Sequence, residues 1–176
     1  MKLPLVIVLN GTGGSGKDTF VDFCKKYSVY KIIHISTITP IKEAAKLLGW
    51  NGEKDEKSRK FLSDIKDLST IAFDCSMKYI EKCIEEAYNN VVDYVFIDCR
   101  EPKEIQKIVD AFGAKTVLIN ALERVPLITS NHADEEVLNY TYDYIIDNNY
   151  GLKEFEKSAQ VFIESFDKVI QNGTIN

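Results

Sequence analysis

Residues 3–20 read LPLVIVLNGTGGSGKDTF, and the fold that we expect for the chain follows from this run. It opens with apolar residues from Leu5 to Leu9, rich in β-branched side chains and without alternation, which is typical of a short strand buried on both faces. A glycine-rich turn follows, then Lys17, then apolar residues spaced i, i+3, i+4 and i+7, as on the buried stripe of a helix. The order strand, glycine loop, lysine and helix is the context of a phosphate-binding loop.

The loop fits the pattern G-x-x-x-x-G-K and predicts the binding of a nucleoside triphosphate. Its glycines allow backbone N–H groups to close around phosphate oxygens, and the helix N-terminus adds unsatisfied donors and its dipole. Lys17 supplies a positive charge. The candidate nucleotide-binding residues are Gly11, Thr12, Gly13, Gly14, Ser15, Gly16, Lys17, Asp18 and Thr19.

The residue after the lysine departs from the strict motif. The motif places Ser or Thr there to hold magnesium, whereas this chain has Asp18, followed by Thr19. Successive helical residues point about 100° apart, so Thr19 does not simply inherit the geometry, although it is a candidate metal ligand. Asp18 suits a helix N-terminus, but its charge would repel a bound phosphate unless it turns outward, which is the orientation that we expect.

Length and composition favour one domain over residues 1–176. The net charge is −5 and the pI is about 5.2, which argues against a broad basic surface for nucleic acid or anionic membrane. No apolar run approaches the length of a membrane span, and we expect no signal peptide. The cysteines lack C-x-x-C spacing and are expected to be small buried side chains of a cytoplasmic protein (Cys24, Cys75, Cys83 and Cys99).

Beyond the loop, predicted strands alternate with predicted helices, as in a parallel α/β sheet. Further strands are expected at 31–35, 93–98, 115–121 and 144–148, and a last helix buries apolar residues from Leu152 to Val169. Three helical segments separate the second and third strands, more than a minimal crossover needs. Thr39 is expected to cap the first of these helices, and Ser69 or Thr70 the third. This insertion, about residues 37–90, is expected to bind a second substrate.

Asp98 ends the third predicted strand, at the edge where parallel sheets bind ligands. A carboxylate there fits the role of holding the magnesium that bridges the phosphates. Arg100 and Glu101 follow immediately. Arginine is scarce, with Arg59, Arg100 and Arg124 the only three in the sequence, so each is a candidate for a position that needs a bidentate donor. A lysine-rich composition would produce the same imbalance.

Residues from about 121 to 136 lose the strand and helix patterns and are interpreted as a lid, because long loops in compact domains are usually functional. Arg124 either closes over a phosphoryl group or lies on the surface. His132 beside Asp134 either belongs to a metal or acid–base site or marks a solvated helix start, which is the favoured interpretation. His34, on an apolar strand, is expected to be a core histidine.

Five segments in series carry a resemblance to a known family: GTGGSGKDTF, STITPIKEAAKLLGW, the charged stretch around Arg59, VFIDCREPKEI and NHADEEVLNYTYDYIIDNN. Together they resemble deoxynucleoside monophosphate kinases of the phage type. The same order resembles the P-loop phosphomevalonate kinases of animals and, more distantly, dephospho-CoA kinases. The resemblance covers nearly the whole chain. It implies a three-layer α/β P-loop NTPase fold with a five-stranded parallel sheet, a helical acceptor-binding insertion and a short lid.

The resemblance also implies transfer of the γ-phosphate of ATP, with Mg²⁺, to a small phosphate-monoester acceptor, a (deoxy)nucleoside monophosphate being favoured. Lys17 resembles the phosphate-cradling lysine, Lys42 and Arg59 resemble acceptor-side cations, and Asp98 with Arg100 resembles a central D-x-R. Arg124 is the single arginine of a lid that is arginine-rich in the family. The catalytic candidates are therefore Lys17, Asp98, Arg100 and Arg124, Arg100 also contacting the acceptor, and the metal candidates are Thr19 and Asp98. A phosphorylated-metabolite kinase, and a nucleotide-binding regulator or ATPase without transfer activity, remain alternatives.

Overall fold

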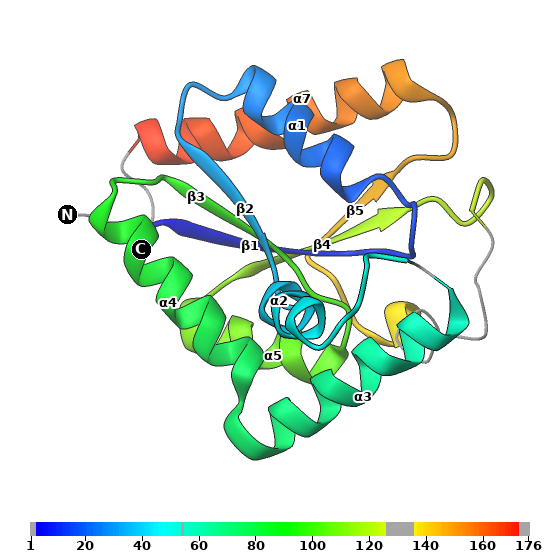
Figure 1. Ribbon diagram of the computed structural model, residues 1–176. Coiled ribbons are helices and arrows are strands. Elements are labelled where there is room, and N and C mark those ends of the chain that lie inside the picture. The colour runs from blue at the N-terminus through cyan, green and yellow to red at the C-terminus, as the bar shows by residue number, and fades with distance from the viewer. Residues whose placement is uncertain (1–2, 54, 126–135, 173–176) are drawn as a thin grey trace.

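The computed structural model describes residues 3–53, 55–125 and 136–172. Figure 1 shows a central sheet between two layers of helices. All five strands of the sheet are parallel, in the order β2-β3-β1-β4-β5, which confirms the predicted fold class. The strands are β1 (Leu5–Asn10), β2 (Ile32–Ser36), β3 (Tyr94–Asp98), β4 (Lys115–Asn120) and β5 (Tyr144–Asp147).

Helices cover both faces of this sheet (Figure 1). One layer contains α1 (Lys17–Tyr27) and α7 (Leu152–Gln171). The other contains α4 (Cys75–Asn89) and α5 (Pro102–Phe112), and the two remaining helices of the insertion, α2 (Thr39–Leu47) and α3 (Glu56–Phe73), lie on the same side. A short 3₁₀ helix, η1 (Glu136–Asn139), precedes β5.

Strand β1 contributes side chains to two hydrophobic cores, one on each face of the sheet. Its side chains point alternately to opposite faces of the sheet, because the side-chain period of a strand is two. Ile7 and Leu9 pack in a cluster with residues of α1 and α7, whereas Val6 and Val8 pack in a second cluster with residues of α4 and α5. A strand covered on both faces has no polar side, which accounts for the unbroken apolar run in the sequence.

The insertion contains the three predicted helices, but their boundary differs from the prediction. Ser69 and Thr70, which were expected to cap the last helix, lie inside α3. The chain breaks instead at Asp74, which has left-handed backbone angles (φ 50°, ψ 45°) and ends α3 just before α4 begins. Asp74 forms an ion pair with Lys107 of α5 at 3.0 Å. The break therefore lies at a residue whose ion-pair partner is on another helix, and local sequence does not reveal it.

Three other expectations for single residues are wrong. Thr39 is the first residue of α2 and Ile38 precedes it as the N-cap, without a side-chain capping bond. Leu152 and Val169, expected to be buried, are 65% and 39% exposed. Both lie near the ends of α7, whose middle supplies the buried residues Phe155, Ala159, Phe162 and Phe166.

The four cysteines are free thiols, but the expectation that all four are buried is wrong for two of them. Cys24 and Cys99 are buried, whereas Cys75 and Cys83 are partly exposed. Burial raises the pKa of the Cys99 thiol, and so do the nearby carboxylates of Glu104 and Glu101. No helix among the described residues combines the length and apolar character that a bilayer crossing requires.

Candidate functional site

The loop between β1 and α1 has the backbone that its glycines predict. Gly11, Gly14 and Gly16 have φ values of 148°, 83° and 101°, a region that side-chain-bearing residues rarely adopt. A Cβ atom on Gly11 would lie 2.5 Å from Oγ of Ser15, and one on Gly16 would lie 2.6 Å from Nδ2 of Asn148. Both positions therefore require glycine for conformation and for space.

The other glycines of the loop face more open surroundings. A Cβ on Gly13 would meet only a guanidinium nitrogen of Arg100, at 3.8 Å, and one on Gly14 only a methyl group of Val125, at 3.9 Å. The structure thus brings Arg100, which follows β3, beside the loop that follows β1. This proximity was expected from Asp98 and Arg100 lying at the carboxyl edge of the sheet.

Lys17 folds its side chain back over the loop. Its Nζ donates to the backbone carbonyls of Gly11 at 2.8 Å and Thr12 at 3.2 Å. The hydroxyl oxygens of Thr12 and Ser15 are enclosed and lack a hydrogen-bond partner among the described residues. Such enclosed polar groups normally have partners, so the loop retains unused hydrogen-bonding capacity next to a fixed positive charge. These features fit a bound phosphate.

Asn10, which sequence reasoning missed, holds the start of the loop. Its Oδ1 accepts the N–H of Gly11 at 2.7 Å, and its Nδ2 donates to the carbonyl of Arg100 at 3.0 Å and to the hydroxyl of Tyr142 at 2.6 Å. Tyr142 donates in turn to the carbonyl of Val137. Burial raises the pKa of Tyr142 to about 12, so its hydroxyl stays protonated near neutral pH. The side chain of Asn10 thus joins two neighbouring strand ends.

Asn148, also missed, holds the far side of the loop. Its Nδ2 donates to the buried carbonyl of Ser15 at 2.8 Å, and its own N–H donates to the carbonyl of Asn120 at 2.7 Å. Its carbonyl accepts a bond from Nε of Arg124 at 2.7 Å. Asn148 and Asn10 share one usable signal in the sequence, an asparagine at the carboxyl end of an apolar strand. Arg124 is exposed, and its closing over a phosphoryl group stays a prediction.

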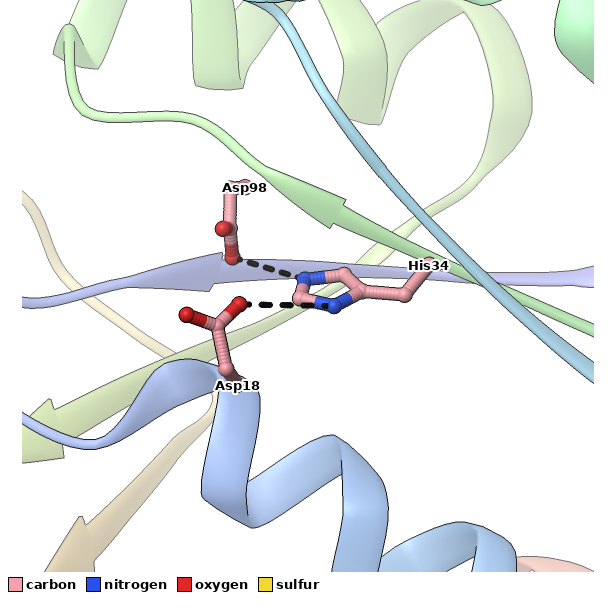
Figure 2. A group of neighbouring side chains, drawn as sticks. All are labelled: Asp18, His34 and Asp98. Carbon is pink, nitrogen blue, oxygen red and sulfur yellow. Dashed lines mark ion pairs between the residues drawn. The ribbon is translucent and has the colours of Figure 1, made fainter. Parts of the chain in front are cut away.

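His34 lies at the site, and the expectation that it is a satisfied core histidine is wrong. Its side chain, 16% exposed, lies between two carboxylates (Figure 2). Nε2 is 3.1 Å from Oδ1 of Asp98, and Nδ1 is 3.7 Å from Oδ1 of Asp18. Asp18 is 91% exposed, in accord with the outward orientation expected for it. The grouping depends on β2 lying beside β3, an adjacency that the sequence of the strands does not reveal.

A buried ion cluster joins the insertion to the segment after Asp98. Lys66 of α3 is only 7% exposed, and its Nζ lies 2.8 Å from Oε2 of Glu104 and pairs with Glu101. Burial lowers the pKa of Lys66, but the two carboxylates outweigh this effect and raise it above its usual value. Burial alone would raise the pKa of Glu101, but the positive charge of Lys66 outweighs burial and lowers this pKa below its usual value. For Glu104 burial is the larger effect, and its pKa is raised.

The remaining predicted site residues lie on different helices. Lys42 on α2 and Arg59 on α3 are exposed, and Thr19 lies partly buried in the first turn of α1. Their roles in acceptor and metal binding stay predictions. Of the predicted lid, residues 121–125 and 136 belong to the described part of the chain. His132 and Asp134 lie outside it.

Comparison with known proteins supports the fold. No family model matches the chain, and no curated protein matches it in sequence. Among solved structures, TT1252 from Thermus thermophilus is 18% identical with a TM-score of 0.55, over 94% of this chain and 98% of that one. A candidate kinase from Chloroflexus aurantiacus is 11% identical with a TM-score of 0.56, over 98% and 99%. Shikimate kinase from Bacteroides thetaiotaomicron is 18% identical with a TM-score of 0.47, over 93% and 98%. At such identities the similarity to the first two structures concerns the fold alone, and the shikimate kinase, with a TM-score below 0.5, supports no argument.

Proposed function

We propose that this protein is an ATP-dependent phosphotransferase that moves the γ-phosphate of Mg·ATP to a phosphate monoester, favouring a (deoxy)nucleoside monophosphate. The observation that carries the proposal is the grouping of Lys17 and Arg100 around a glycine loop that is shaped to bind phosphate. Phosphoryl transfer depends on positioning and on neutralisation of charge rather than on covalent chemistry. A fixed lysine and a neighbouring arginine supply both.

On the donor side, the loop N–H groups and the start of α1 are suited to the phosphates of ATP. Lys17, held against the carbonyls of Gly11 and Thr12, places its charge beside them. The carboxylate of Asp98 and the hydroxyl of Thr19 are oxygen ligands of the kind that Mg²⁺ prefers. When bound, Mg²⁺ would bridge phosphate oxygens and neutralise developing charge.

On the acceptor side, we assign binding of the phosphate monoester to the insertion α2–α4 and to Arg100. The planar fork of Arg100 suits a phosphate, and Lys42 and Arg59 are further cations of the insertion. The Lys66 cluster fixes α3 against the residues that follow Arg100, so a substrate held by α3 would be placed relative to the loop. A phosphate-monoester oxygen is already nucleophilic and needs no strong general base.

The choice of a nucleoside monophosphate rests on the sequence resemblance, and a phosphorylated metabolite is the alternative acceptor. The candidate kinase from Chloroflexus aurantiacus supports kinase chemistry by analogy of fold. The net charge of −5 favours small-molecule partners over nucleic acid or anionic membrane. Because its four cysteines are free thiols, we place the protein in a reducing cytoplasm.

The test is coupled ADP release from Mg·ATP across a panel of acceptors: common deoxy- and ribonucleoside monophosphates, phosphomevalonate and dephospho-CoA. We expect one nucleoside monophosphate to raise turnover well above the rate with ATP alone. Lys17→Ala should lose this activity, whereas Lys25→Ala, an exposed lysine of the same helix, should keep it. ATP binding without a response to any acceptor would favour a nucleotide-binding regulator. Full turnover by Lys17→Ala would overturn the assignment.

A further inference from the structure

Three side chains from three elements converge beside the phosphate-binding loop. Asp18 comes from α1, His34 from β2 and Asp98 from the end of β3 (Figure 2). Each offers one ligand atom, and these atoms all lie within 4.8 Å of one another. A nitrogen and two carboxylate oxygens this close can bind one ion together.

One atom of His34 and one atom of Asp98 are enclosed and lack a hydrogen bond. Nε2 of His34 and Oδ1 of Asp98 lie 3.1 Å apart, close enough for an ion pair, but neither atom forms a hydrogen bond with any of the described residues. Neither atom is therefore committed to a hydrogen bond that a metal ion would have to break. Neighbouring ligands of an octahedral ion with bonds of about 2.1 Å lie about 3.0 Å apart, close to this separation.

A second group of possible ligands already holds a positive charge. Cys99, Glu101 and Glu104 also bring their ligand atoms together. There the ammonium of Lys66 already lies against both carboxylates, so a positive charge is present.

We propose that Asp18, His34 and Asp98 bind a divalent first-row transition ion, Mn²⁺, Co²⁺ or Zn²⁺, before any nucleotide binds. The imidazole nitrogen favours these ions over Mg²⁺ and Ca²⁺, which prefer oxygen ligands alone. Asp18 is 91% exposed, so the ion can enter from solvent and keep water in its remaining positions. Binding of the ion does not depend on the proposed function. Contact between the ion and a nucleotide phosphate would rest on it.

The experiment titrates Co²⁺ into the nucleotide-free protein and follows its visible absorption, with Zn²⁺ and Mg²⁺ as competitors. We expect saturable binding of one ion, displaced by Zn²⁺ and resistant to excess Mg²⁺. His34→Ala and Asp98→Asn should weaken binding by at least roughly tenfold, the scale on which even supporting residues of metal sites act. His34→Gln, checked for folding by circular dichroism, guards against a variant that fails to fold. The controls are Cys99→Ser and His132→Ala, which remove the thiol of the second cluster and the other histidine of the chain.

Three results would overturn the inference. The first two are no Co²⁺, Mn²⁺ or Zn²⁺ binding at millimolar concentration, and equal binding by the wild type and His34→Ala. Loss of binding in Cys99→Ser with retention in His34→Ala would move the ion to the second cluster and overturn it equally. ATP binding is measured on the same samples. ATP binding without metal binding contradicts this inference alone, whereas metal binding without ATP binding supports it and contradicts the proposed function.

Discussion

The side-chain amide of Asn148 donates to the buried carbonyl of Ser15 at 2.8 Å, which joins the end of β5 to the glycine loop after β1 across 133 positions of sequence. A Cβ on Gly16 would lie only 2.6 Å from Nδ2 of the same side chain. The loop is therefore shaped by a strand at the edge of the sheet as well as by its own glycines. Binding of phosphate to the loop should consequently respond to residues that do not touch phosphate.

We expect Asn148→Ala to lower the free energy of unfolding by about 1–3 kcal/mol, because it leaves the buried carbonyl of Ser15 without a donor. The loop should also lose order, so ATP should bind more weakly. Urea unfolding and ATP titration measure the two effects. Asn89→Ala, on the exposed face of α4, is the control and should change neither. Unchanged stability of Asn148→Ala would show that the amide is not needed.

Gly16→Ala should destabilise the protein more than Gly49→Ala does. Both glycines have positive φ, 101° and 98°, and an alanine there costs about 1–2 kcal/mol of backbone strain. A Cβ on Gly49 meets open space, whereas one on Gly16 lies 2.6 Å from Nδ2 of Asn148. The difference in unfolding free energy between the two variants isolates this clash. Equal values would mean that Asn148 moves aside without cost.

The sequence predicted the strands and the loop because both depend on local pattern. The run from Leu5 to Leu9 and the G-x-x-x-x-G-K spacing each point to one structure. The sequence did not predict the surroundings of His34. A histidine within an apolar strand gives the same sequence pattern whether its neighbours in space are apolar side chains or carboxylates. The ion pairs of Lys66 were not predicted either. Lys66 is one of several charged residues of α3, and its partners lie at the start of α5, far along the chain.

Lys66→Met should destabilise the protein by about 2–4 kcal/mol, because it leaves Glu101 and Glu104 partly buried without a counter-charge. Adding Glu104→Gln to this variant should restore part of the loss by removing one of the two unpaired charges. Lys60→Met removes only an exposed pair with Asp64 and should cost less than about 1 kcal/mol. Denaturant unfolding measures all three. A cost for Lys66→Met no larger than that for Lys60→Met would contradict the role of the cluster.

The two glutamates should affect acid stability in opposite directions. The pKa of Glu101 in the folded protein lies below its usual 4.5, so its contribution is present above pH 4.5 and is lost as the pH falls through the lowered pKa. The pKa of Glu104 lies above 4.5, so the folded state gains stability relative to the unfolded state as the pH falls toward 4.5. Unfolding free energies from pH 7 to 3 test this. On acidification, wild type should lose stability relative to Glu101→Gln and gain it relative to Glu104→Gln. If the stability difference from wild type changed with pH in the same direction for both variants, the opposite pKa shifts of the two carboxylates would be contradicted.

Arg100 offers the sharpest test of the transfer chemistry, because its guanidinium lies beside Gly13 of the loop and its backbone carbonyl is held by Asn10. If Arg100 neutralises the transferring phosphoryl group, as we propose, Arg100→Ala should lower kcat/KM by roughly 10³-fold or more, in the range known for arginines in phosphoryl transfer. Arg100→Lys keeps the charge but loses the planar fork, so its activity should lie between those of Arg100→Ala and wild type. The Asn10 bond uses the backbone of Arg100 and is kept in both variants, and unfolding curves measured on the same samples separate a loss of folding from a loss of transfer. Equal activity of the lysine variant and wild type would mean that charge alone matters. Equal activity of the alanine variant and wild type would remove Arg100 from the transfer step.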